Sequence, residues 1–280
     1  MKNLKINAMT VDVEDYFQVA AFDSLISPDN WGDYSLRVFA NTTKILDIFR
    51  KHNVKATFFI LGWVAEREPE LIRLIAEDGH EIANHGYMHQ KAFNQTYEEF
   101  LNDITKSKKI LEEISGKKVV GYRAPSFSID KRNEWAFDAL LESGHLYSSS
   151  TYPVSHDHYG TPEWSTKPFK VGGGLLELPQ ATIDLCGRRL PVGGGGYFRL
   201  FPLMLSEYFL GKFHEQHDHP YIFYFHPWEI DPEQPRVEGA SSKSKFRHYV
   251  NLSRMEAKIA KLCKNHKWES IETAFNIGKE

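Results

Sequence analysis

A short apolar run followed by three carboxylates is the feature that most constrains how this chain can fold. Ile6, Ala8 and Met9 lead into the segment Thr10-Val11-Asp12-Val13-Glu14-Asp15. This pattern predicts a strand with carboxylates at its C-terminal end, where α/β folds place their reacting groups. Like charges this close repel one another, so a folded chain keeps them where a metal ion or an arginine compensates them. The alternative interpretation is a solvated acidic turn.

Strand and helix patterns alternate along most of the chain. Short apolar patterns predict strands at residues 56–60, 81–84, 119–123, 221–225 and 268–271. Apolar residues spaced three and four apart predict helices at residues 41–52, 66–78, 96–115, 131–143, 201–217 and 244–265. This alternation is typical of a wound parallel sheet or a (β/α) barrel, although residues 150–199 look irregular. Because no linker divides the chain, we expect a domain over residues 1–235 with residues 236–280 packed on it.

Composition excludes several classes of protein. The formal net charge is -3 and no basic block stands out, so no nucleic-acid partner is expected. The two cysteines, Cys186 and Cys263, form no CxxC pair, which argues against a disulfide scaffold and favours a reducing compartment. Residues 1–5 show no signal-peptide pattern, and the apolar run at 56–65 is too short to span a bilayer. We therefore expect a soluble, cytoplasmic protein, with a peripheral membrane location left open.

Two histidines follow the predicted strand at residues 81–84. His85 and His89 are four residues apart, and on a helical turn this spacing would place both imidazoles on one face, suited to a single metal ion. The spacing alone is a weak signal in a chain with 13 histidines. Their position after a strand, however, predicts that they share a sheet edge with Asp12 and Asp15. Two imidazoles and one carboxylate form an open catalytic zinc site, and cobalt, nickel or iron would fit the same ligands.

Four separated motifs then occur in a specific order. The acidic strand end is followed by Gly-His-Glu-Ile-Ala-Asn-His-Gly-Tyr-Met-His at residues 79–89, by Arg123-Ala124-Pro125, and by a late strand that ends in His226. Over residues 9–227 this order resembles the carbohydrate esterase family 4 polysaccharide deacetylases, the NodB-homology family. The resemblance implies a distorted (β/α) barrel with an elaborated C-terminal segment. The acidic start and residues 246–252 also resemble the subgroup associated with exopolysaccharide and exosortase loci.

The resemblance implies metal-assisted removal of an N-acetyl group. Asp12 would be the general base for a metal-bound water nucleophile, and His85 and His89 would be metal ligands. The third ligand is open, because the usual adjacent aspartate is replaced by valine. Glu14 shares a strand face with Asp12, whereas Asp15 has the usual side-chain type and is slightly favoured.

Three further groups complete the implied reaction. Arg123 would pair with the catalytic aspartate and keep it ionised, although an ordinary strand-end ion pair is the alternative. The backbone amides after Pro125, at Ser126 or Phe127, would form an oxyanion hole. His226 would be the general acid that protonates the departing amine, and no clear aspartate partner for it is visible in the sequence.

Aromatic residues gather in the irregular stretch and beyond it. Tyr152 and Trp228 are predicted to bind the glycan, because aromatic rings stack on sugar faces, and core filling is the alternative for each ring. The same choice applies to a further set of rings: Tyr147, Tyr159, Trp164, Tyr197 and Phe198. The run of glycines at residues 193–196 would either allow close approach of a glycan or form a flexible loop.

These expectations define a metal-dependent polysaccharide N-deacetylase that acts on N-acetylhexosamine units, with exopolysaccharide biosynthesis as the favoured context. A metal-free cyclic-amide hydrolase of the allantoinase kind is one alternative, and His85 and His89 argue against it. A non-catalytic glycan-binding protein is the other, and the presence of both Asp12 and His226 argues against that.

Overall fold

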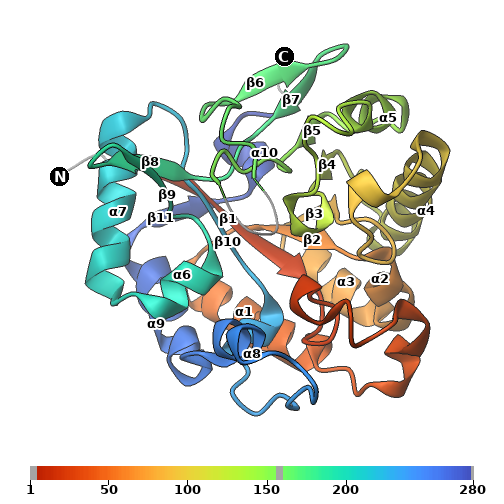
Figure 1. Cartoon of the computed structure of the whole chain (residues 1–280), viewed down its shortest axis with the longest axis horizontal. Helices are drawn as coiled ribbons and strands as arrows, with labels where there is room; N and C mark the ends of the chain where they lie inside the picture. The colour runs from red at the N-terminus through yellow and green to blue at the C-terminus, as the bar shows by residue number, and fades with distance from the viewer. Residues whose placement is uncertain (1–4, 156–159, 279–280) are drawn as a thin grey trace.

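One curled sheet organises the chain, as the computed structural model shows for residues 5–155 and 160–278 (Figure 1). Its strands are β1 (Ile6–Val13), β2 (Thr57–Ile60), β3 (Glu81–Asn84), β4 (Gly121–Tyr122), β5 (Tyr147–Ser148), β6 (Phe169–Val171), β7 (Leu175–Glu177), β10 (Ile222–Phe225) and β11 (Lys267–Glu269). They run in the order β10-β1-β2-β3-β4-β5-β7-β6, with β11 also paired to β1. Only the β6–β7 pair of this sheet is antiparallel. The predicted distorted (β/α) barrel is thus confirmed as an open, curled half-barrel.

Helices surround this sheet (Figure 1). They are α1 (Val38–His52), α2 (Gly62–Arg67), α3 (Pro69–Glu77), α4 (Tyr97–Ser115), α5 (Ala136–Glu142), α6 (Gly195–Leu200), α7 (Leu203–Gln216), α8 (Ser242–Tyr249), α9 (Leu252–Asn265) and α10 (Ile271–Ala274). Short 3-10 turns include η1 (Ala20–Phe22), η2 (Pro28–Asp33), η3 (Ala92–Asn94), η4 (Pro125–Phe127) and η5 (Pro227–Ile230). Among the described residues, no helix is both long and apolar enough to cross a membrane.

Three predicted segments differ from the structure. The helix expected at residues 66–78 is two helices, because Pro69 opens α3 and cannot extend the hydrogen bonding of α2. The helix expected at residues 244–265 is also divided, since Asn251 has a left-handed backbone with φ of 55°. The stretch expected to be irregular contains β6, β7 and a separate hairpin of β8 (Thr182–Leu185) and β9 (Arg188–Pro191).

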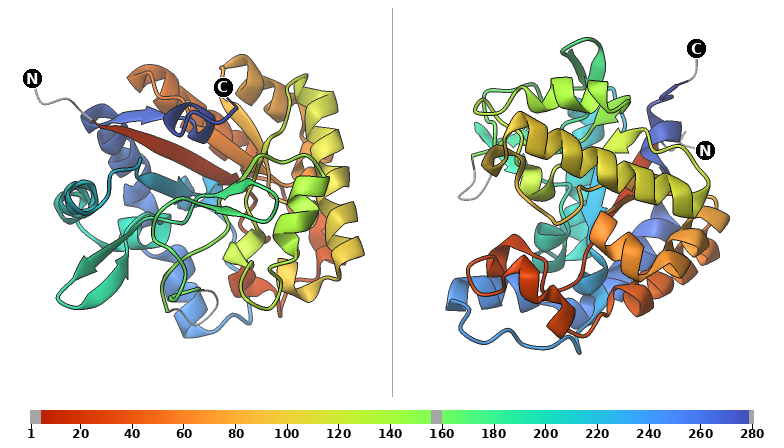
Figure 2. Two further views of the ribbon diagram at one scale, coloured as in Figure 1. Left: turned by 90° about the horizontal axis from the view of Figure 1, so that it is seen from above. Right: turned by 90° about the vertical axis from the view of Figure 1, so that its right-hand side faces the viewer.

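The C-terminal residues pack against the sheet beside its first strand. Strand β11 runs parallel to β1, with Lys267 opposite Ile6, and Figure 2 shows the two side by side. Helix α9 packs against α1 and against η5. Residues beyond 236 therefore support the sheet edge formed by β1 and β10.

A buried carboxyl group ties this C-terminal segment to the sheet. Glu81 at the start of β3 accepts hydrogen bonds from Thr57 Oγ1 (2.5 Å), Tyr147 Oη (2.5 Å) and the backbone N–H of Glu272 (3.0 Å). Thr57 Oγ1 in turn accepts from the backbone N–H of Ile271 at the start of α10. Burial raises the pKa of Glu81 to about 7, although the three hydrogen bonds oppose this shift.

The raised pKa of Glu81 predicts a loss of stability with rising pH. Between pH 4.5, its ordinary pKa, and about 7, the unfolded chain loses this proton before the folded chain does. The free energy of unfolding therefore falls across this window, by about 3 kcal/mol for this group. We expect Glu81→Gln to remove this fall in the free energy of unfolding, which is measured by urea unfolding at a series of pH values from 4.5 to 8. Glu77→Gln, which changes an exposed side chain on α3, should retain this pH dependence, and an unchanged pH dependence in Glu81→Gln would refute the assignment.

Candidate active site

The ion pair at the end of β1 brings distant parts of the chain together. Asp12 is 3% exposed and Arg123 is fully buried. Arg123 Nη1 donates to Asp12 Oδ1 at 2.6 Å and to Thr10 Oγ1 at 2.8 Å. Arg123 follows β4, so this contact crosses the interior of the curled sheet from β4 to β1. It holds the Asp12 carboxylate at the C-terminal edge of the sheet.

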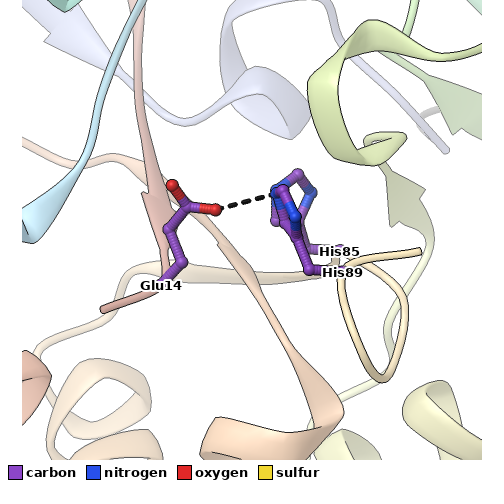
Figure 3. Close-up of side chains that lie close together, drawn as sticks. All are labelled: Glu14, His85 and His89. Atoms are coloured by element: carbon purple, nitrogen blue, oxygen red, sulfur yellow. Dashed lines mark ion pairs between the residues drawn. The ribbon is translucent and has the colours of Figure 1, made fainter. Parts of the chain in front are cut away.

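His85 and His89 lie beside the acidic strand end on the loop after β3. The predicted helical turn is wrong, because Gly86 (φ 77°) and His89 (φ 53°) have left-handed backbones and no helix forms there. The loop nevertheless brings the two imidazoles together, with ring centroids 5.5 Å apart. Glu14 faces them across the site (Figure 3), and one ligand atom from each of the three residues lies within 4.8 Å of the others.

The donor atoms of these three side chains fit a divalent metal ion. Burial lowers the pKa of His85 to about 3, so its ring is neutral. The Nδ1 of His85 lies 2.8 Å from the carbonyl oxygen of Arg123, and this contact assigns the ring proton to Nδ1. Nε2 is then free to bind a metal, as in many metal-bound histidines. His89 Nε2 lies 2.9 Å from Glu14 Oε2, a buried oxygen without a hydrogen bond from any described residue.

Asp15 is turned away from the histidines. Its Oδ2 accepts from the backbone N–H groups of Arg37 (2.6 Å) and Val38 (2.9 Å), and its Oδ1 accepts from Tyr16 N–H (2.9 Å). It thus satisfies N–H groups at the start of α1, a role that suits a short carboxylate. Of the two carboxylates left open by the sequence, the geometry favours Glu14 and not the slightly preferred Asp15.

His226 reaches the same site from the neighbouring strand. It directly follows β10, which pairs with β1 in parallel. Its Nε2 lies 3.7 Å from Glu14 Oε1 and 4.0 Å from Asp12 Oδ2. Burial alone would lower the pKa of His226, but the carboxylates of Glu14, Glu229 and Asp12 raise it to about 9. The imidazole is therefore able to carry a proton at neutral pH.

The sequence analysis missed the partner of His226. His226 Nδ1 donates to Glu229 Oε1 at 2.8 Å, and Glu229 Oε2 accepts from Arg199 Nε at 2.7 Å. The sequence contains a signal for this contact, because Glu229 lies three residues after His226 in His-Pro-Trp-Glu. One helical turn brings two side chains at this spacing close together. The carboxylate lies so close to α6 that a Cβ on Gly195 would meet Glu229 Oε1 at 2.4 Å.

The glycine run at residues 193–196 packs closely against protein groups. A Cβ on Gly194 would lie 2.6 Å from Tyr224 Oη, and the carbonyl of Gly193 accepts from Tyr224 N–H at 2.8 Å. The run therefore fits α6 against β10 and Glu229. The alternative of a flexible loop is not what the structure shows.

The turn predicted to stabilise an oxyanion has an unusual backbone. Pro125 opens η4, and Ser126 (φ 55°) and Phe127 (φ 51°) both adopt the left-handed region. For residues other than glycine each such conformation costs about 1–3 kcal/mol and is found most often at functional sites. Phe127 N–H donates to the carbonyl of Ala124 at 3.0 Å, so the Ser126 amide is the better candidate of the two.

The aromatic rings predicted to stack on sugars are mostly core residues. Trp228 is 6% exposed, and its ring stacks with His226 (centroids 5.3 Å apart) and His248 (4.1 Å), so little of the ring is open to a sugar. Its Nε1 donates to Glu14 Oε1 at 3.2 Å, which orients the carboxylate. Tyr152 is 1% exposed and packs against Phe127. Of the remaining rings, Tyr147 and Phe198 are buried, Trp164 and Tyr197 are half-buried, and Tyr159 lies outside the described residues.

Comparisons with known proteins agree with this geometry. Residues 32–140 match the family "Polysaccharide deacetylase", and residues 149–276 match a "Domain of unknown function (DUF3473)". Over 96 residues the chain is 41% identical to a peptidoglycan-N-acetylglucosamine deacetylase of Bacillus cereus, covering 34% of this chain and 35% of the relative. Over 127 residues it is 30% identical to a peptidoglycan deacetylase of Helicobacter pylori, covering 44% and 41%. Over residues 32–140 the chain is therefore similar to polysaccharide deacetylases. The matches nevertheless span less than half the length of these two relatives.

Experimental structures share the fold. A Mycobacterium smegmatis protein assigned to the polysaccharide deacetylases superimposes with a TM-score of 0.64 at 22% identity, over 99% of this chain and 92% of that one. A CE4 family pseudoenzyme from Bacillus anthracis superimposes with a TM-score of 0.50 at 16% identity, over 98% of this chain and 66% of that one. Because the fold also occurs in a pseudoenzyme, activity has to be argued from the side chains of the site.

The geometry predicts which side chains bind metal. We expect the wild type to bind about one equivalent of zinc or cobalt in a calorimetric titration, and His89→Ala and Glu14→Gln to weaken binding at least about tenfold. Asp15→Asn should retain the affinity but lower thermal stability, because it weakens the acceptor at the start of α1. Loss of metal binding in Asp15→Asn with full binding in Glu14→Gln would reverse the assignment.

Proposed function

We propose that this protein is a metal-dependent hydrolase that removes N-acetyl groups from N-acetylhexosamine units of a polysaccharide. One observation carries the proposal: an arginine-held carboxylate and an imidazole meet beside three side chains that fit a metal. Asp12 Oδ2 and His226 Nε2 are 4.0 Å apart, and both approach Glu14 at the C-terminal edge of β1 and β10. A base and an acid so placed suit hydrolysis of an amide.

Glu14, His85 and His89 would hold the metal. Two imidazoles and one carboxylate leave an open position, and this ligand set makes zinc the metal that we propose. When bound, the metal would polarise the acetamide oxygen and lower the pKa of water. The Trp228 N–H that donates to Glu14 and the Arg123 carbonyl that accepts from His85 would orient two of the three ligands.

Asp12 and His226 would move the protons of the reaction. Asp12 takes a proton from the attacking water as the water oxygen bonds to the acetyl carbon, and Arg123 keeps this carboxylate oriented. The bond between carbon and nitrogen then breaks, and His226 Nε2 donates its proton to the departing amine nitrogen. The products are acetate and the free amino sugar. The Ser126 N–H is the candidate donor to the oxygen of the tetrahedral intermediate.

The proposed substrate class is supported by the named relatives and by the proposed reaction. The named relatives act on peptidoglycan N-acetylglucosamine or are peptidoglycan deacetylases, and we propose an N-acetylated glycan here as well. A role in exopolysaccharide biosynthesis is supported by the resemblance of residues 12–17 and 246–252 to that subgroup. We propose no nucleic-acid partner, in line with the net charge of -3.

Two isosteric substitutions test the assigned roles. We expect Asp12→Asn and His226→Gln each to reduce acetate release from an N-acetylglucosamine oligosaccharide by about 10²- to 10⁴-fold. The titrated metal stoichiometry should remain that of the wild type, because neither side chain is a proposed ligand. Activity near the wild-type level in either variant would remove that residue from the mechanism.

A glycan-binding protein without activity gives a different result. If the zinc-loaded wild type binds the oligosaccharide but releases no acetate, the deacetylase proposal is wrong and the binding alternative is supported. A metal-free cyclic-amide hydrolase would instead retain full activity on a cyclic amide after the metal is removed by chelation.

A further inference from the structure

A second buried arginine holds the partner of His226. Arg199 on α6 is 3% exposed and Glu229 is 1% exposed, and their ion pair is 2.7 Å long. A buried pair of this kind is stable only where the remaining donors and acceptors are also satisfied. Glu229 meets this condition by accepting at 2.8 Å from His226 Nδ1. The ion pair is therefore connected directly to the imidazole that faces Asp12.

The other donors of Arg199 reach the end of α8. Its Nη1 donates to the carbonyls of His248 (2.8 Å) and Val250 (2.9 Å), and its Nη2 donates to the carbonyl of Arg247 (3.0 Å). Carbonyls in the last turn of a helix lack partners within the helix, and a cation there is favourable. Asn251 Nδ2 donates back to the carbonyl of Arg199 at 3.1 Å. All three nitrogens of the guanidinium are thus occupied, so its orientation is fixed.

The same helix supports the site through a ring contact. His248 stacks on Trp228 with an interplanar angle of 12°, and its Nε2–H donates to Gln234 Oε1 at 2.6 Å. Trp228 also stacks with His226, at an interplanar angle of 19°. Helix α8 therefore contacts the surroundings of His226 by two routes, one through Arg199 and Glu229 and one through Trp228.

We propose that Arg199 is a positioning residue that fixes Glu229, and that the end of α8 is the support that fixes Arg199. This inference rests on the proposed deacetylation. Glu229 holds the Nδ1 proton of His226, so that Nε2 presents its proton toward Asp12 and the departing amine. Because Arg199, His226, Glu229 and α8 all lie within residues 149–276, the segment matched as a domain of unknown function completes the deacetylase site.

The proposal predicts selectivity for the leaving group. An amine departs from an amide only with protonation, whereas a nitrophenolate departs from an aryl acetate without it. Damage to the orientation of His226 should therefore slow amide hydrolysis and leave ester hydrolysis nearly unchanged. A general loss of structure would slow both reactions, because both use the same metal site and base.

The experiment compares both reactions in three variants of the full chain loaded with zinc. We expect Glu229→Gln and Arg199→Lys to lower kcat for an N-acetylglucosamine oligosaccharide by about 10- to 100-fold with little change in KM. Their rates with 4-nitrophenyl acetate should change by less than about threefold. Arg236→Ala is the matched control, because Arg236 is exposed and lies over the Tyr249 ring without touching Glu229. It should leave both rates unchanged.

Each outcome decides the proposal. Equal losses in both reactions, or no loss in either, would overturn the proposal. Full amide activity in Arg199→Lys would also overturn it, because lysine keeps the positive charge but lacks the planar fork of N–H donors. If Arg199→Lys fails to unfold cooperatively, the isosteric Glu229→Gln carries the test. A wild type that hydrolyses the ester but not the amide would instead refute the proposed deacetylation, which is a distinguishable result.

Discussion

The buried ion pair between Asp12 and Arg123 is the interaction on which the site depends. Removing two charges from water costs several kcal/mol for each ion, and this cost is recovered only where the geometry is good and the other polar atoms are satisfied. Arg123 meets that condition by also donating to Thr10 Oγ1 and to the carbonyl and hydroxyl of Ser149, while its guanidinium lies 4.1 Å from the centroid of Phe59. These partners come from β1, from β2 and from the end of β5. The curled sheet must therefore close around the arginine, and this closure brings Asp12 to the loop after β3.

The pair formed by Arg199 and Glu229 repeats this arrangement on the other side of the site. In each case a buried arginine fixes a carboxylate: Asp12, which we assign as the base, and Glu229, which contacts the assigned acid His226. The first arginine follows β4 within the region of the deacetylase match, and the second lies on α6 beyond it. Leaving either buried carboxylate without its arginine would be costly, so each ion pair keeps its carboxylate in one orientation. Each half of the chain thus supplies its own buried arginine, which holds one carboxylate of the site in place.

The sequence predicted which strand ends meet because a parallel sheet leaves little freedom. Asp12, His85, Arg123 and His226 each lie within or directly after a strand, and parallel strands place their C-terminal ends at one edge. Local conformations were less predictable. The left-handed backbone of Gly86 converts the expected helical turn at His85 and His89 into a loop, and periodicity carries no signal for one such residue.

Local sequence patterns also could not predict residues whose contacts are distant in the sequence. Arg199 follows a glycine run in a stretch without clear periodicity, and its partners at residues 247–250 are about 50 positions away. Trp228 was predicted to stack on a sugar because ring type alone does not reveal that two histidines already stack with this ring. Burial of a side chain depends on the tertiary contacts of its neighbours, which local spacing does not encode.

The acidic segment itself shows why three adjacent carboxylates can fold together. Each has a different compensation: Asp12 has the guanidinium of Arg123, Glu14 has the imidazoles of the loop after β3, and Asp15 has the N–H groups at the start of α1. Strand β1 ends at Val13, where the Glu14 N–H donates to the Asp12 carbonyl at 3.1 Å, so the backbone turns and Glu14 lies beyond the strand end. The additional methylene of glutamate then extends the carboxylate from beyond the strand end to the histidines. The shorter Asp15 is better suited to the nearby backbone, and side-chain length therefore separates the two roles that the sequence left open.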